Sequence, residues 1–335
     1  MRIRAVPQIV RRSETRAKLE RMLRTTWAIY RAAVQERADV YHFHDVELVP
    51  VGMLLRLRRH RVVYDIHEDY PREILSKYYV PVWLRPLLAR VVEKIENLAV
   101  SRFSALVITT PHIAERFRHL DRPVFIVQNF PILNELVDGT RTTPWQRREA
   151  AVIYVGNITI MRCIREMIAA IELLPEDLSA ELHLAGTYSP PGLRNDVANL
   201  RGWKRVRELG FLDRQGVKQA LQRVKAGLVL FRPGLNYTNA YPNKMFEYMA
   251  AGIPVVASDF PLWREVVNKS GCGILVDPLD PRAIATAMAH LLHNPQKAEE
   301  MGQSGRRAVE ELYNWESEKR KLLTLYEQLV SGGYS

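Results

Sequence analysis

Short runs of β-branched and other apolar residues alternate along this chain with longer amphipathic segments. This alternation predicts parallel β-strands covered by α-helices. In the first half the predicted strands are Asp39–Phe43, Arg61–Ile66, Ala105–Thr109 and Val124–Val127, and the clearest predicted helices are Arg16–Gln35 and Trp83–Ser101. The segment Pro131–Arg148 contains Gly139 and Pro144 and has no clean periodicity, which is typical of a linker.

The pattern then restarts in the second half of the chain. Predicted strands are Ala151–Val155, Glu181–Ala185, Val206–Leu209, Gly227–Phe231, Pro254–Ser258 and Gly273–Val276, and the last predicted helices are Pro281–His293, Pro295–Leu312 and Trp315–Val330. A chain of 335 residues is about right for two α/β domains. We therefore expect two Rossmann-like, doubly wound parallel-sheet domains over residues 1–135 and 150–314, facing a cleft in which ligands bind.

The beginning of the chain departs from this pattern. A nucleotide-binding α/β domain normally opens with a strand and a glycine-rich turn into a helix. Here a short apolar run, Ile3–Val6, leads into a charged helix, and no glycine occurs before Gly52. The first half is expected to be truncated by one or two strand–helix units.

Composition and charge indicate a globular protein and the classes of molecule that it could bind. Apolar residues make up 47% and charged residues 25%, the balance of a globular protein with a sizeable core. The formal net charge is +11, and residues 1–140 hold 23 Lys and Arg against 16 Asp and Glu. Such a surplus attracts nucleic acid, anionic lipid head groups or phosphorylated substrates, although ordinary solvated faces explain it equally well.

The cysteines and the apolar runs indicate in which compartment the protein is expected and whether it could span a membrane. Cys163 and Cys272 are far apart and without metal-ligand spacing, which argues against a disulfide framework or a zinc site and favours a reducing cytoplasm. The first residues contain no apolar core for a signal peptide, and the longest uncharged run, Ala283–Gln296, is too short to span a bilayer. Any membrane contact is therefore expected to be peripheral.

The most informative stretch is Tyr237–Ser258. It predicts a loop, a helix with Pro242 near its first turn and Gly252 at its end, and then a buried strand. Unpaired backbone N–H groups around Asn243 and Lys244 would offer a site for a diphosphate, and the Lys244 ammonium would reinforce it. Glu247, one turn further on, could accept hydrogen bonds from ribose hydroxyls. A capped helix followed by a core strand is the alternative.

This stretch resembles the motif of the family-4 (group 1) retaining glycosyltransferases, which have the two-domain GT-B fold. In that family two glutamates stand eight positions apart before a run of small residues, glycine, proline and valine, and Phe246–Ser258 matches the second half almost throughout. The resemblance implies that Glu247 binds the donor ribose. The first glutamate, which orients the donor sugar, is replaced by Asn239, an uncharged group that can still donate and accept hydrogen bonds.

Two further segments carry the same resemblance. In Tyr154–Met167 a strand runs into Gly156, a loop and a helix whose N-terminal turn is expected to carry Arg162. In the family a basic residue follows the glycine and a second comes about five positions later, and both hold the donor phosphates. Asn157 replaces the first, and Arg162 stands at the second. A plain strand–turn–helix connection is the alternative reading of these residues.

The segment Val206–Leu212 resembles the strand over which the nucleotide base lies in the family, and Gly210 would allow close backbone approach. A strand ending in an ordinary turn is the alternative.

In the first half, Asp65–Pro71 follows a predicted strand and resembles the family's histidine segment. By that resemblance His67 would approach the transferring sugar. His44 and Asp45, at the end of the preceding strand, should reach the same rim, and His42 and His44 should share one face of the sheet. A metal site built from these residues is possible, and so is a satisfied histidine at a strand end. The resemblance favours no metal, because GT-B enzymes do not use one.

Two segments could contact anionic lipid. The helix Arg16–Gln35 has an apolar face that usually covers a sheet, but Trp27 and Tyr30 could instead lie at a lipid interface. The basic turn Arg56–Arg61 could face lipid phosphates, although a solvated helix end is the simpler reading.

The resemblance implies transfer of a sugar from a nucleoside diphosphate, UDP favoured, to a hydroxyl of a glycan or lipid-linked acceptor, without a cofactor. The implied mechanism is front-face attack with retention, in which Arg162, Lys244 and the helix N-terminus stabilise the departing diphosphate. The last helix, residues 315–330, would cross back to the first domain, as in GT-B proteins. A catalytically impaired relative or fragment, or a basic nucleic-acid-binding protein, remains as an alternative.

Overall fold

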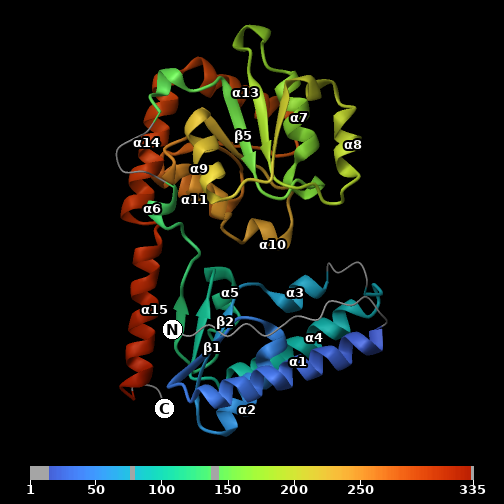
Figure 1. Cartoon of the computed structure of the whole chain (residues 1–335), viewed down its shortest axis with the longest axis vertical. Coiled ribbons are helices and arrows are strands. Elements are labelled where there is room, and N and C mark those ends of the chain that lie inside the picture. Colours follow the sequence, from blue (N-terminus) through green and yellow to red (C-terminus); the bar gives the residue numbers. More distant parts are fainter. Residues whose placement is uncertain (1–14, 76–79, 137–142, 333–335) are drawn as a thin grey trace. The chain divides into compact units, whose positions relative to one another are not determined.

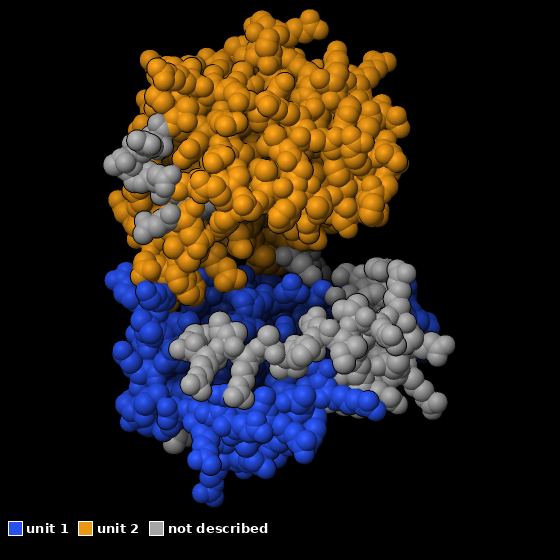
Figure 2. Space-filling view, in the orientation of Figure 1, with its two compact units in different colours: residues 1–128, 319–335 blue, residues 129–318 orange. Residues whose placement is uncertain are grey.

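The computed structural model describes residues 15–75, 80–136 and 143–332. The chain divides into two compact units, shown in different colours in Figure 2. Unit 1 comprises Met1–Gln128 and Lys319–Ser335, and unit 2 comprises Asn129–Glu318. In this division residues 129–135 group with the second unit, whereas the sequence pattern placed them at the end of the first domain.

Unit 1 is built on a four-stranded parallel sheet in the order β1-β2-β3-β4 (Figure 1). The strands are β1 (Val40–Phe43), β2 (Arg61–Ile66), β3 (Ala105–Ile108) and β4 (Val124–Ile126), and the helices include α1 (Thr15–Glu36), α2 (Val49–Leu57), α3 (Tyr70–Ile74), α4 (Arg85–Val100) and α5 (Pro111–Glu115), with a 3-10 turn η1 (Val46–Leu48). The predicted strands and helices are confirmed to within about two residues. Strands β2 and β3 are buried on both faces, as expected for a parallel sheet covered by helices. The run Ile3–Val6 lies outside the described residues.

The four strands of this sheet follow one another in sequence order, so the winding in the described part of unit 1 runs in one direction. Phe103 and Phe117 are fully buried in its core, and the rings of Phe43 and Tyr64 stack with centroids 4.8 Å apart. The last helix, α15 (Trp315–Val330), continues into unit 1 from Lys319, and the Lys321 ammonium donates to the carbonyl of Ile126, 3.3 Å away in β4.

Unit 2 contains a six-stranded parallel sheet in the order β10-β9-β8-β5-β6-β7. Its strands are β5 (Ala151–Val155), β6 (Glu181–Ala185), β7 (Val206–Gly210), β8 (Ala226–Val229), β9 (Val255–Ser258) and β10 (Gly273–Val276). The chain winds outward from β5 in one direction and then returns to β8 to wind in the other. The expected double winding is therefore confirmed in this unit, and the switch point, where α/β proteins bind ligands beyond the carboxyl ends of the strands, falls between β5 and β8.

Helices cover both faces of this sheet (Figure 1). One core contains the inner sides of α7 (Ile164–Glu172), α8 (Leu193–Ala198) and α13 (Pro281–His293), and the other contains those of α9 (Arg214–Arg223), α11 (Asn243–Ala250) and α12 (Pro261–Ser270). The remaining elements are α6 (Leu133–Leu136), α10 (Leu235–Thr238), α14 (Pro295–Glu311) and the 3-10 turns η2 (Trp145–Arg147), η3 (Ile160–Arg162), η4 (Glu176–Leu178) and η5 (Arg201–Arg205). The predicted linker Pro131–Arg148 thus contains α6 and η2, with residues 137–142 outside the described part. None of the helices described is long and apolar enough to cross a membrane.

Candidate functional site

The glycines that follow β5 and β6 donate backbone hydrogen bonds to the ends of the neighbouring strands β6 and β7. Gly156 donates to the carbonyl of Ala185 at 2.8 Å, and Gly186 donates to that of Gly210 at 2.7 Å. Gly186 has φ +150°, and a Cβ there would lie 1.9 Å from the Gly156 carbonyl oxygen, so only glycine fits. Sequence reasoning missed Gly186, although it stands directly after a predicted strand, as Gly156 does.

Two cations gather beside Gly156 on a shared aromatic support. The guanidinium carbon of Arg162 lies 3.6 Å from the ring centre of Phe231, and the Lys244 ammonium lies 5.3 Å from that same ring centre. Lys244 also donates to the hydroxyl of Tyr154 at 3.2 Å. A Cβ on Gly156, whose φ is +127°, would lie 3.2 Å from the Lys244 nitrogen. The structure therefore brings together Gly156, Arg162 and Lys244, as the sequence pattern predicted.

Both cations are partly withdrawn from water. Burial, reinforced by the nearby Arg162 charge and opposed by Glu247, lowers the pKa of Lys244 to about 7. Burial also lowers the pKa of Arg162. Among the described residues neither cation forms a salt bridge with a carboxylate. Two desolvated cations without a counter-ion are a site for an anion, because a bound anion restores the interactions that burial removes.

The position of Arg162 differs from the prediction. It was expected in the first turn of a helix, but it ends the 3-10 turn η3, and Cys163 then adopts a left-handed conformation with φ 56° before α7 begins at Ile164. The prediction was wrong because periodicity does not distinguish a 3-10 turn from the start of the following α-helix. The turn holds Arg162 over the ring of Phe231, which follows β8.

The N-terminus of α11 adds backbone dipoles to this site. The helix begins at Asn243, and Pro242 at its N-cap position makes no side-chain hydrogen bond to it. Because an uncapped N-terminus presents backbone N–H groups and a partial positive charge, it favours an anion. Lys244 is the second residue of this helix, so the ammonium and the helix N-terminus lie together.

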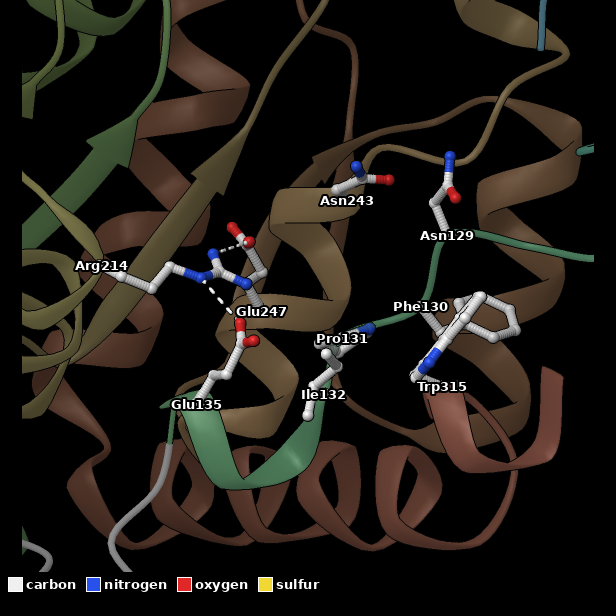
Figure 3. Close-up of a pocket in the computed structure, with 9 residues that line it drawn as sticks. All are labelled: Asn129, Phe130, Pro131, Ile132, Glu135, Arg214, Asn243, Glu247 and Trp315. Atoms are coloured by element: carbon white, nitrogen blue, oxygen red, sulfur yellow. Dashed lines mark hydrogen bonds and ion pairs between the residues drawn. The ribbon is translucent and has the colours of Figure 1, made fainter. Parts of the chain in front are cut away.

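Glu247, further along α11, faces a cavity of about 270 Å³ beside the helix (Figure 3). The Arg214 guanidinium lies between two carboxylates, 2.5 Å from a Glu247 oxygen and 3.2 Å from a Glu135 oxygen. The cavity is lined by Asn129, Phe130, Pro131, Ile132, Glu135, Arg214, Asn243, Glu247 and Trp315. Sequence reasoning found Asn243 and Glu247 but missed Arg214 and Glu135, which nothing in the local pattern singles out.

The other predicted donor-site residues are Asn157, Asn239 and Gly210. Exposed Asn157 follows Gly156, and its carbonyl accepts a hydrogen bond of 2.7 Å from Tyr154. Asn239 is half-buried at the end of α10. Gly210 is exposed at the end of β7, with φ +68° and open space where a Cβ would stand.

The predicted histidine of the first half lies in unit 1, in a cluster around one carboxylate. The ring nitrogens of His42 and His44 are each 3.2 Å from an Asp65 oxygen, and that of His67 is 3.4 Å away. His44 and His42 stack with ring centres 5.0 Å apart, which confirms that they share one face. The other nitrogen of His42 is 2.6 Å from the Tyr326 hydroxyl in α15, a partner that the sequence pattern did not reveal.

Asp65 sets the charge states in this cluster. Burial by itself would raise its pKa, but hydrogen bonds from His42 and His67 outweigh burial and lower the pKa to about 2. The hydrogen bond that the His67 ring donates to Asp65 raises the pKa of His67 above its usual value, against the effect of burial. Burial instead lowers the pKa of exposed His44, although Asp65 opposes the shift. His67 is thus a histidine oriented by a buried carboxylate.

Within the described part of the chain, two groups of residues have ligand atoms close enough to hold a metal ion. One is His42, His44 and Asp65, and the other is Glu149, Glu181 and His183; within each, the ligand atoms lie within 4.8 Å of one another. In the second group the Arg207 guanidinium lies 3.5 Å from a Glu149 carboxylate oxygen, so an arginine already neutralises part of the negative charge of this group. The expectation that the protein uses no metal stays a prediction.

The two segments considered for lipid contact are engaged within unit 1. Tyr30 is buried with 7% of its surface exposed, so the idea that it lies at a lipid interface is wrong. Trp27 is half exposed, and Arg31 lies over its ring. The Arg56 side chain donates to the carbonyls of Arg102 at 2.7 Å and His60 at 3.0 Å, so it is used to hold the backbone.

Two glycosyltransferase families match this chain. The profile of the family described as "Glycosyl transferases group 1" matches residues 141–308, and that of the "Glycosyl transferase 4-like domain" matches residues 1–127. The chain is 24% identical over 302 residues to a phosphatidyl-myo-inositol mannosyltransferase of Mycobacterium leprae, covering 88% of this chain and 75% of that protein. It is 26% identical to an MMP alpha-(1->4)-mannosyltransferase of Mycolicibacterium hassiacum, covering 58% and 47%.

Solved structures show the same fold at low identity. The sucrose-phosphate synthase of Thermosynechococcus elongatus aligns with a TM-score of 0.74 at 19% identity, covering 93% of this chain and 79% of that one. Anabaena HepE in complex with UDP aligns with a TM-score of 0.70 at 14% identity, covering 92% and 82%. These likenesses confirm the expected two-sheet GT-B fold class.

Proposed function

Since the chain belongs to the glycosyl transferases group 1 family, we propose that it transfers a sugar from a nucleoside diphosphate to a hydroxyl group of an acceptor. The observation that carries this proposal is the pairing of Arg162 and Lys244 over Phe231, beside the N-terminus of α11. These groups supply two charges and a helix dipole at one place, which is what a diphosphate requires. Glu247 is one turn further along α11, a spacing suited to the ribose attached to that diphosphate.

The donor nucleotide that we propose is UDP. This choice is supported by the structural neighbour HepE, which is described in complex with UDP and with UDP-glucose. The sugar depends on Asn239, which stands where the family has a glutamate. An amide in place of a carboxylate keeps hydrogen bonding to sugar hydroxyls but loses the charge, so we expect Asn239 both to donate to and to accept from hydroxyls of the donor sugar.

The chemistry that we propose is front-face transfer with retention at the anomeric carbon. The bond from the anomeric carbon to the diphosphate oxygen breaks, the acceptor oxygen attacks from the same side, and the departing diphosphate accepts the acceptor proton. Arg162, Lys244 and the α11 N-terminus stabilise the negative charge that builds on the diphosphate. These groups need no metal ion for this task. His67, held by Asp65, is the residue of unit 1 that we assign to positioning the transferred sugar.

The acceptor that we propose is a glycan or a lipid-linked glycan used in cell-surface polysaccharide or glycolipid synthesis, at the inner face of a membrane. The basic surplus of residues 1–140 supports an acceptor that carries phosphate. One relative is named a phosphatidyl-myo-inositol mannosyltransferase, and the lipid in that name carries a phosphate. A relative that binds nucleotide sugar without turnover is the second candidate, because Asn239 departs from the family at the sugar-reading position.

A thermal-shift screen of the whole chain against UDP, GDP, ADP and their sugars tests the donor site. We expect UDP and UDP-sugars to raise Tm in the wild type and to lose this effect in Glu247→Ala and Lys244→Ala. Lys204→Ala, at an exposed lysine of unit 2, is the control and should respond like the wild type. No stabilisation by any nucleotide, or equal responses in all variants, would refute the site.

Release of UDP from UDP-sugars in the presence of membrane extract separates the two candidates. An active transferase gives a glycosylated product whose anomeric configuration matches that of the donor. Binding without any product identifies the inactive relative. If the chain is retained on heparin but gives no salt-sensitive gel shift with nucleic acid, the nucleic-acid-binding alternative is excluded.

A further inference from the structure

One face of α4 in unit 1 is apolar and exposed. Five of its members lie on α4 at helical intervals that place them on one side of the helix, and the sixth, Trp83, lies in the turn just before the helix begins at Arg85. Between 36% and 79% of the surface of each is exposed: Trp83, Leu87, Leu88, Val91, Ile95 and Leu98. We call these six residues the α4 face. Single exposed apolar residues are ordinary, but a continuous row on one helix marks a surface that is covered by something else.

The acidic residues of α4 point away from this face. Glu96 is buried, lies 2.6 Å from the Arg116 guanidinium and accepts a hydrogen bond of 3.3 Å from Tyr64. Glu93 is ion-paired with Arg72. Both carboxylates are therefore neutralised inside unit 1, and they contribute no negative charge next to the α4 face.

The exposed charges of α4 are positive and border the α4 face. Arg90 and Lys94 are both exposed and lie one turn apart, so they form a single basic edge. Trp83, which is 79% exposed, stands at the N-terminal end of the row. An apolar stripe with an aromatic residue at its end and cations along its border is the arrangement of a helix that lies in the interface of an anionic membrane.

We propose that the α4 face docks unit 1 on the surface of an anionic phospholipid bilayer. Leu87, Val91 and Ile95 enter the boundary between head groups and acyl chains, and Arg90 and Lys94 contact the lipid phosphates. The inference extends the lipid-linked acceptor of the proposed function, but it rests on this surface alone. It names α4, and not the α1 residues considered from the sequence, as the membrane contact.

A second copy of the chain fits this surface less well. A symmetric pair would bring two sets of Arg90 and Lys94 to one interface, because the same patch of both copies meets in such a contact. No exposed carboxylate of α4 is available to pair with them. A bilayer of anionic lipid supplies the missing negative charge together with the apolar medium.

The test is co-sedimentation of the full chain with vesicles, without sugar donor. We expect binding to vesicles of phosphatidylcholine containing 30% phosphatidylglycerol and little binding to phosphatidylcholine alone. The double variant Leu87→Asn, Ile95→Asn should lower the partition coefficient about tenfold or more, because it removes apolar area from the interface. Arg90→Glu and Lys94→Glu should each lower it about fivefold or more and weaken its dependence on salt.

Matched controls keep the result interpretable. Leu173→Asn and Arg165→Glu alter a half-exposed apolar residue and an exposed cation of unit 2, and both should bind as the wild type does. All variants should keep the wild-type Tm, since the altered side chains are exposed. The proposal is overturned if the wild type does not bind anionic vesicles, if the α4 variants bind like the controls, or if sedimentation velocity shows a dimer that only the α4 variants dissociate. Since no donor is present, none of these outcomes bears on the proposed transfer reaction.

Discussion

The Lys244 ammonium lies 3.2 Å from the hydroxyl of Tyr154 and 4.4 Å from the centre of its ring. The aromatic partner favours a cation, but it cannot replace the water that burial removes, so the pKa of Lys244 falls to about 7. At neutral pH the ammonium is therefore only partly charged until an anion arrives. We therefore expect the proposed nucleotide binding to be sensitive to pH.

The affinity for UDP should fall as pH rises above about 7. A bound diphosphate stabilises the protonated form of Lys244, so binding takes up a proton. The dissociation constant should increase by up to about tenfold per pH unit until the pKa of the complex is reached. Titration calorimetry in buffers of different ionisation enthalpy measures the proton uptake, and Lys244→Gln should abolish it. Binding with no proton uptake in the wild type would contradict the assignment.

Lys244 should also lower the free energy of unfolding, and more so at low pH than at high pH. Its folded pKa lies below that of the unfolded chain, so the destabilisation is fully present below pH 7 and is relieved as pH rises towards 10.5. Lys244→Met should therefore raise the free energy of unfolding at pH 6 by on the order of 1 kcal/mol, and by less at pH 9. Urea unfolding at the two pH values checks this difference.

Phe231 should matter to nucleotide binding although it touches no phosphate in our proposal. Its ring supports both Arg162 and Lys244, so Phe231→Leu should weaken UDP binding about threefold to tenfold through loss of the cation–π contacts. Phe260→Leu is the matched control, since Phe260 is equally buried in the same core. Both variants should lose about 1–2 kcal/mol of stability. If both also weaken UDP binding equally, Phe231 acts through packing alone.

The two carboxylates held by Arg214 should differ in function. Glu247→Gln should raise the dissociation constant for UDP about tenfold, because a ribose contact loses a charged acceptor. Glu135→Gln should leave it nearly unchanged, since Glu135 is assigned no contact with the nucleotide. Calorimetry on both variants distinguishes the roles, and equal effects would mean that Glu247 serves only the ion pair with Arg214.

Asp65 should govern His67 and the acid stability of unit 1. The pKa of Asp65 is lowered to about 2, so its contribution of about 2 kcal/mol is present above pH 4 and is lost as pH falls towards 2. Asp65→Asn should remove this contribution, so its stability should change less than that of the wild type over the same range. The pKa of His67 should fall in that variant, because the Asp65 hydrogen bond raises it. NMR titration of the His67 ring measures this shift, and an unchanged pKa would show that Asp65 does not act on His67.

The local parts of this protein could be predicted from its sequence. Strand and helix positions follow from the spacing of apolar residues, so β2, β5, β6, β10 and α13 have their predicted bounds. The positions that we propose for the donor site, Gly156, Lys244 and Glu247, could be found because glycine, lysine and glutamate lie within short motifs next to those elements. Arg162 was found as a residue but misplaced in a helix, because a 3-10 turn leaves no distinct spacing.

The partners of these residues were decided by tertiary structure. Phe231 meets Arg162 because β5 and β8 are neighbours in the sheet although they are far apart along the chain. Tyr154 of β5 likewise meets Lys244, which lies in α11. Arg214 reaches Glu247 across 33 positions of the chain, and Tyr326 reaches His42 across 284. In α4 the periodicity predicted one apolar side but could not tell whether it was covered. Only packing shows that Glu96 is buried against Arg116 and that Leu87 and Ile95 are exposed, because burial depends on which elements meet and not on the spacing within one of them.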